Sequence, residues 1–159
     1  MSLLIAFAAR LLLVGLFLPF SALDKVLNFG AAVDQAAAAV PARPVARLLI
    51  LAGFCVEVAM SLAVLTGVAD RLAAFVLAGY CTVTALLWKQ FWRTPDFRLK
   101  GPSRGRELFW DFMKNLAVAG GFLMLATGGE ASGVDRLAHE PLASSHPYAL
   151  TPPGAPDGR

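Results

Sequence analysis

Two charged side chains lie inside long apolar stretches of the sequence, and they are the first candidates for chemistry. Arg10 lies about seven residues into the apolar run 3–23, and Glu57 about twelve residues into the run 45–68. At 1.5 Å of rise per helical residue, they are roughly 10 Å and 18 Å from opposite faces of a hydrocarbon core about 30 Å thick. These nearly matching depths predict a buried Arg10–Glu57 ion pair between antiparallel helices.

Three interpretations of these two residues remain open. Gly53, Glu57 and Ser61 follow i, i+4 spacing, so small residues flank the carboxylate and admit a close neighbouring helix. A structural ion pair would lock the register of the two helices. A functional pair would make Glu57 a proton-active or quinone-binding carboxylate, because charges inside spanning helices are costly and mark functional sites. In the third interpretation the two residues do not pair.

A second group of polar residues lies where the apolar runs end. Asp111 and Lys114 are three residues apart, so they can pair on one helix face. The whole group either anchors the helix ends at the cytoplasmic face of the membrane or forms a cationic mouth for an anionic head group or a reduced substrate. Its members are Asp24, Lys25, Lys89, Asp111, Lys114 and Asn115.

Cysteine and histidine offer fewer options for chemistry. Cys55 and Cys81 fall at similar depths in neighbouring runs, so they either form a thiol pair or act as small apolar fillers. His139 and His146 lie outside the apolar runs, so we expect neither haem nor a metal site. We also expect no covalently bound cofactor; any electrons must travel through a diffusible cofactor such as quinone or through a partner.

Four apolar runs must position these residues. Hydrophobic residues make up 57% of the chain and charged residues only 16%, against about 25% charged residues in a soluble domain. Each run is long enough to cross a membrane, and in lipid its backbone amides must be paired within the run, as in a helix. The sequence therefore predicts an all-α transmembrane four-helix bundle within residues 1–127, with helices over 3–23, 45–68, 72–88 and 108–127.

The connections complete this predicted architecture. The Ala-rich stretch 34–39, followed by Pro41, predicts a short interfacial helix between the first two spanning helices. The turn 69–71 is so short that the second and third helices must form an antiparallel hairpin. Residues 128–159 become polar and then Pro-rich, which predicts an extramembrane tail without a core of its own.

Positive charge is unevenly divided between the two ends of the predicted bundle. Ten of the 14 Lys and Arg residues belong to the first and third connections or to the helix ends beside them. The positive-inside rule places these connections in the cytoplasm and both termini outside, in a multi-pass protein of a bacterial-type inner (plasma) membrane. We expect membrane lipids as partners and no nucleic acid, because topology explains the basic residues.

Several residues follow one another in a characteristic order and spacing from the first predicted helix to the fourth. They are Arg10, Gly15, Phe17, Leu23-Asp24-Lys25, Gly53 with Glu57, Gly67, Arg71, Met113-Lys114-Asn115-Leu116-Ala117 and Gly120-Gly121. This pattern resembles the DoxX family of small four-helix membrane proteins. Ser21 and Ser61 depart from it, because glycine is expected at both positions.

This resemblance implies a redox role. Some DoxX-like proteins are membrane subunits of thiosulfate:quinone oxidoreductases, and others associate with redox or detoxification partners. The resemblance carries a quinone-side role onto Arg10, Glu57, Lys25 and Lys114. We therefore expect an accessory or anchoring subunit of a quinone-linked membrane complex, bound to other protein chains and not catalytic alone.

Other functions remain open beside this expectation. The chain would have an enzymatic role if it were the quinone-reducing subunit of such a complex. A small-molecule transporter or carrier, gated by Arg10 and Glu57, is an alternative, although the sequence lacks the internal inverted repeats that many transporters have. A purely structural membrane protein is the last alternative.

Overall fold

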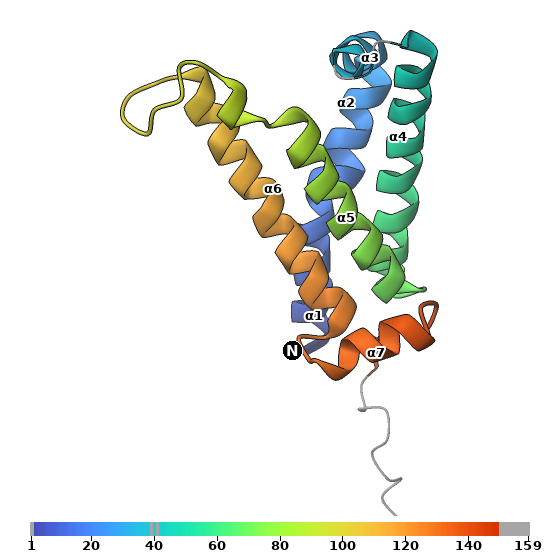
Figure 1. The fold of residues 1–159 in the computed structure, drawn as a ribbon. Coiled ribbons are helices and arrows are strands. Elements are labelled where there is room, and N and C mark those ends of the chain that lie inside the picture. Colours follow the sequence, from blue (N-terminus) through green and yellow to red (C-terminus); the bar gives the residue numbers. More distant parts are fainter. Residues whose placement is uncertain (1, 39, 41, 150–159) are drawn as a thin grey trace, which may run out of the picture.

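The computed structural model describes residues 2–38, 40 and 42–149, and every regular element within these residues is helical. Figure 1 shows their arrangement. The elements are α1 (Ser2–Gly15), the π-helix η1 (Leu16–Ser21), α2 (Ala22–Leu27), α3 (Phe29–Ala37), α4 (Arg43–Thr66), α5 (Asp70–Trp88), the 3-10 helix η2 (Phe91–Arg93), α6 (Arg104–Thr127) and α7 (Ser132–His139).

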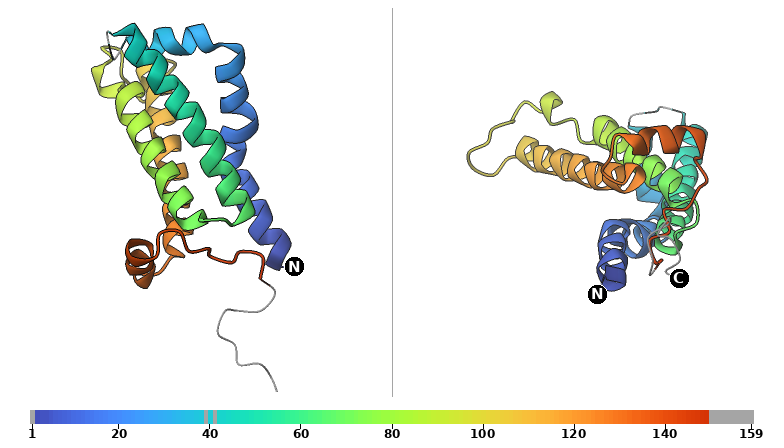
Figure 2. Two further views of the ribbon diagram at one scale, coloured as in Figure 1. Left: turned by 90° about the vertical axis from the view of Figure 1, so that its right-hand side faces the viewer. Right: turned by 90° about the horizontal axis from the view of Figure 1, so that it is seen from below.

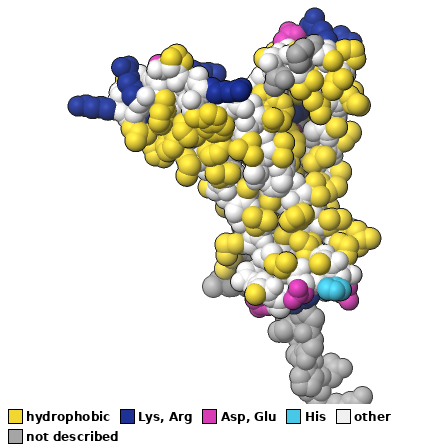
Figure 3. All heavy atoms as spheres, in the orientation of Figure 1, with side chains coloured by type: hydrophobic (Ala, Val, Ile, Leu, Met, Phe, Trp, Pro, Cys, Tyr) yellow, Lys and Arg dark blue, Asp and Glu magenta, His cyan; other side chains and the backbone are white. Residues whose placement is uncertain are grey.

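Four long apolar helical segments confirm the predicted membrane bundle. Many large apolar side chains point outward, including Leu12, which is 81% exposed. On the face shown in Figure 3, hydrophobic side chains fill the middle of the molecule, and Lys and Arg gather at its upper end. Lipid is the solvent that suits such a surface. The segments long and apolar enough to span are Leu3–Leu27, Arg43–Thr66, Asp70–Arg93 and Arg104–Thr127.

The second and third spanning segments form the predicted antiparallel hairpin. α4 ends where Gly67 adopts a left-handed conformation with φ of +78°, which is how many helices end. α5 begins at Asp70, two residues before the predicted start, because an acidic side chain is favourable in the first turn of a helix. α6 packs along α5 and approaches α1 closely at Gly121, where an added Cβ would meet Leu13 at 2.9 Å.

A short helix does lie between the first two spanning segments. α3 crosses the end of the bundle, as Figure 2 shows. It covers Phe29–Ala37 rather than the predicted 34–39, because Val33 and Ala36 share one face and are buried against Ala46 of α4. Residues 39 and 41 of this connection lie outside the described residues.

The first spanning segment is a composite helix. Pro19 lies inside it and has no backbone N–H to donate, and the residues around it adopt the wider π geometry of η1. The N–H of Ala22 bonds to the carbonyl oxygen of Phe17, one residue further back than in an α-helix. One extra residue in a turn rotates the side chains that follow by about 100°, which changes the face that α2 presents to the bundle.

The residues after α6 fold back across the opposite end of the bundle from α3. α7 crosses this end, and the stretch after it runs along the α4–α5 turn (Figures 1 and 2). The Tyr148 hydroxyl donates to the Leu65 carbonyl, and Pro147 packs against Gly67. Part of the predicted tail therefore rests on the helices. Residues 150–159 lie outside the described residues.

Arg10 is buried at this end, but its partner is not Glu57. Its guanidinium lies 2.7 Å from Asp70 Oδ2, and it also donates to the Val64 carbonyl at 2.7 Å and to Ser145 Oγ at 2.9 Å. Ser145 donates to Asp70 from both its backbone N–H and its hydroxyl. The predicted Arg10–Glu57 pair is therefore wrong, and the buried cation is bound by the first residue of α5.

The direction of helical side chains explains this correction. The Cα–Cβ bond of every helical residue tilts toward the helix N-terminus. Arg10 therefore leans toward the end of the bundle that holds the chain's N-terminus, where Asp70 lies. Glu57 leans toward the start of α4, which is at the other end. Two residues at nearly equal backbone depth on antiparallel helices thus extend away from one another.

We predict that Arg10→Ala lowers the free energy of unfolding by about 3–5 kcal/mol, because it leaves the buried Asp70 carboxylate without its cation. In a double-mutant cycle, Arg10→Ala and Asp70→Asn should be non-additive by on the order of 2–3 kcal/mol. Denaturant unfolding of the purified protein in mild detergent measures both quantities.

The matched comparison is a cycle of Arg10→Ala with Glu57→Gln, which should be additive. Cys55→Ala, on the exposed surface of α4, should leave stability nearly unchanged. Coupling between Arg10 and Glu57 without coupling between Arg10 and Asp70 would contradict the structure.

Candidate functional site

Glu57 lies at the centre of a buried hydrogen-bond network, which we call the Glu57 network: Ser21, Lys25, Glu57 and Tyr80. The Glu57 side chain is 2% exposed. Lys25 Nζ lies 2.7 Å and 2.8 Å from its two carboxylate oxygens, and the Tyr80 hydroxyl donates to Oε1 at 2.6 Å. Ser21 Oγ donates to the carboxylate at 3.1 Å and accepts from Lys25 at 2.7 Å. One buried carboxylate thus accepts from three side chains.

Local structure brings these residues together. Ser21 and Lys25 are four residues apart and share a helix face just after the π-turn of η1. Lys25 tilts back from the end of α2 toward the middle of the bundle, and Glu57 tilts toward it from α4. Gly53 lets the Tyr80 ring approach α4, since a Cβ at this position would lie 3.1 Å from the Tyr80 hydroxyl oxygen.

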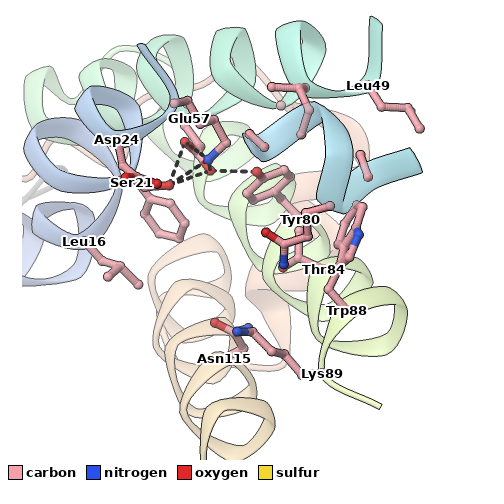
Figure 4. A pocket seen from close by; sticks show the side chains of 17 residues that line it. Leu16, Ser21, Asp24, Leu49, Glu57, Tyr80, Thr84, Trp88, Lys89 and Asn115 are labelled. Atoms are coloured by element: carbon pink, nitrogen blue, oxygen red, sulfur yellow. Dashed lines mark hydrogen bonds and ion pairs between the residues drawn. The ribbon is translucent and has the colours of Figure 1, made fainter. Parts of the chain in front are cut away.

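A cavity of about 330 Å³ adjoins the Glu57 network. Its walls come from η1, α2, α3, α4, α5 and α6, and they reach from the network to the end of the bundle beneath α3. Apolar residues such as Leu16 and Ile50 make up much of the lining. Figure 4 shows Ser21, Glu57 and Tyr80 along one wall, with Lys89 and Asn115 on the opposite side.

The polar cluster predicted at the helix ends is divided between this cavity and the surface. Asp24, Lys25, Lys89 and Asn115 line the cavity. Asp111 lies outside its lining and bridges two cations, Lys89 at 3.1 Å and Lys114 at 3.4 Å. The Lys114 side chain is 73% exposed, so this outer part of the cluster contributes at most about 1 kcal/mol per pair to stability.

The two cysteines do not form the thiol pair that the sequence left open beside the role of apolar filler. Both are free thiols: Cys55 is exposed on the outer surface of α4, and Cys81 is buried in the core beside Leu77 and Ala78. Cys81 behaves as the small apolar filler that the sequence offered as the alternative. Within the described stretches of the chain, no three His, Cys, Asp or Glu side chains come together as a metal site.

Three residues of these networks had no place in the sequence-based prediction. Asp70 falls in the predicted turn 69–71, although an acid at the start of an apolar run is a common feature of a first helical turn. Tyr80 has no role in the prediction, but a phenol in the middle of an apolar helix needs a hydrogen-bond partner for its hydroxyl. Ser145 lies in the polar tail and gives no sequence signal of its contact with Arg10.

The fold and this site define a helical multi-pass membrane protein with a charged, tyrosine-containing network beside a partly open cavity. The DoxX family model matches residues 5–90, which is more than half of the chain and includes all four residues of the Glu57 network. The chain belongs to the DoxX family. No curated protein and no solved structure matches the chain significantly.

This arrangement can hold a small molecule and exchange a proton with it. The cavity offers apolar walls for a ring or chain and a few polar groups for orientation, as small-molecule sites do. The Tyr80 hydroxyl joins the cavity to the Glu57 carboxylate, and Lys25 balances the carboxylate charge. A ligand with both a lipid-like part and a hydrogen-bonding head group suits such a lining.

We predict that Lys25→Met lowers the free energy of unfolding by about 3–5 kcal/mol, because Glu57 would remain buried without a cation. Adding Glu57→Gln to this variant should recover part of the loss. Tyr80→Phe should cost about 1.5–3 kcal/mol, the contribution of a hydrogen bond to a charged group. Helix loss followed by circular dichroism during detergent titration measures these effects.

Lys114→Met is the matched control, since it removes the same type of charge at an exposed position. Equal stabilities of the Lys25→Met and Lys114→Met variants would show that the Glu57 network does not hold the bundle together.

Proposed function

We propose that this protein is an accessory or anchoring subunit of a quinone-linked membrane redox complex and that its cavity receives the quinone head group. The observation that carries the proposal is the cavity itself, because it places an apolar lining beside the buried Glu57 network. Membership of the DoxX family supports the redox assignment, since the resemblance noted from the sequence implies such partners.

The residues present fit a quinone head group. A cavity of about 330 Å³ is at the lower end of the volumes of small-molecule pockets, which suits a single substituted ring. Trp88 and Asn115 line the cavity and make no side-chain hydrogen bond within the part of the chain that the structure describes. Their N–H groups are thus available to quinone oxygens, and the Trp88 ring offers a surface for stacking.

The Glu57 network would manage protons at this site. A bound quinone supplies a centre that takes up or releases two electrons and two protons. The Tyr80 hydroxyl can pass a proton between the cavity and Glu57 Oε1, to which it is hydrogen-bonded at 2.6 Å. Lys25 compensates the carboxylate charge.

The proposal includes an orientation and partners. The excess of Lys and Arg in the first and third connections favours a cytoplasmic location for the end that holds α3 and the cavity, with both termini outside a bacterial-type inner membrane. The electron donor or acceptor would then be another protein chain of the complex. Residues 128–159, which begin just after α6, would lie outside the membrane on the opposite side.

We predict that a short-chain quinone such as decylubiquinone binds the purified protein and quenches its tryptophan fluorescence, since Trp88 lines the cavity. Ala32→Phe should weaken this binding at least roughly tenfold, because Ala32 lines the cavity and a phenyl ring would occupy it. Quenching titrations in mild detergent give both dissociation constants.

Ala31→Phe is the matched control, since Ala31 is the exposed neighbour of Ala32 on α3 and does not line the cavity. Equal affinities of the two variants would place the quinone elsewhere.

Purification of the protein from its native membrane tests whether it belongs to a complex. A chain that runs alone, without a redox partner or bound quinone, would refute the proposed role.

A further inference from the structure

A second groove runs along α3 and α4, and its lower part shares Lys25 and Ile50 with the lining of the cavity beside the Glu57 network. Its upper part is a hollow of about 200 Å³ whose lining includes Arg43, Arg47 and Phe29. Its lower part, of about 160 Å³, is lined by Phe29, Leu51 and Phe54 among other residues. Because Phe29 and Leu51 belong to both linings, the two hollows adjoin. We call this feature the α3–α4 groove.

The mouth of the α3–α4 groove is positively charged. Arg43 pairs with Asp34 at 2.6 Å, but both side chains are about two-thirds exposed, so this pair is weak and a stronger anion can compete for Arg43. Arg47 makes no ion pair within the described parts of the chain. The two arginines are four residues apart on α4 and share one face.

The two arginines lie at the helix end, and the deeper lining of the groove is apolar apart from Lys25, which is paired with Glu57. Arg43 is the first residue of α4 and lies at the end of the spanning segment. Leu51 and Phe54 follow roughly 12 Å and 17 Å deeper along the helix. A phosphate at the arginines would therefore place an attached acyl chain against apolar side chains inside the hydrocarbon layer, which is about 30 Å thick.

We propose that the α3–α4 groove binds an anionic phospholipid. The phosphate lies between the Arg43 and Arg47 guanidinium groups, which bind phosphate oxygens in a bidentate manner, and one acyl chain follows Phe29, Leu51 and Phe54. Asp34 is the one acidic side chain shown at this mouth, and it competes with the phosphate for Arg43. This site does not depend on the proposed quinone role of the cavity beside the Glu57 network.

The test measures binding of dioleoylphosphatidylglycerol and of the zwitterionic dioleoylphosphatidylcholine to the full chain, by native mass spectrometry from detergent. We expect clear preference for the anionic lipid. Arg47→Gln should weaken its binding roughly fivefold, since one cation near a membrane surface contributes about that factor. Asp34→Asn should strengthen it, because it releases Arg43 from its ion pair.

The matched controls are Arg104→Gln and Glu107→Gln, which break an exposed pair at the same end of the molecule but outside the groove. Neither should change lipid binding. If Arg104→Gln weakens binding as much as Arg47→Gln does, the lipid is held only by general surface charge and the proposal fails. It also fails if glycerol 3-phosphate displaces the lipid at equal concentration, because the acyl chain would then contribute nothing.

Discussion

An ionised side chain inside a lipid-covered bundle is tolerated only beside an opposite charge, and this constraint fixes how the helices of this protein meet. The cations of the two ion pairs, the buried Arg10 and the largely buried Lys25, belong to the first spanning segment, one toward each end of it. Both buried carboxylates belong to the α4–α5 hairpin: Glu57 lies within α4, and Asp70 begins α5. The first segment is therefore attached to the hairpin at two levels, and removing any one charge leaves its partner unpaired in an apolar medium.

The position of the two ion pairs also explains where the protein can hold a ligand. Around the Arg10–Asp70 pair, the tail residue Ser145 completes the hydrogen bonding and covers the bundle end. α6 contributes to neither pair. α6 contacts α1 near Gly121. Toward the end of the bundle that holds α3, α6 diverges from α2 and α3, as Figure 1 shows. The cavity lies at that wider end, with the Glu57 network in its wall.

Much of the fold could be predicted from the sequence, because lipid imposes helices on long apolar runs and a short turn imposes a hairpin. One cavity is lined by four of the polar residues that the sequence places at the ends of the apolar runs: Asp24, Lys25, Lys89 and Asn115. The partners of the buried charges could not be predicted from backbone depth, because side chains tilt toward helix N-termini and carry their charges away from that depth. The contribution of Ser145 depends on how the tail folds back, and its local sequence does not specify that.

The central claim is that Lys25 and Glu57 form one buried pair and that Arg10 belongs to another. Exchange of charges tests it directly, with the amount of folded protein in membranes measured by fluorescence-detected gel filtration. Lys25→Glu and Glu57→Lys should each reduce that amount sharply, and the two together should restore much of it. Restoration by Arg10→Glu combined with Glu57→Arg, and none by the Lys25–Glu57 exchange, would contradict the account.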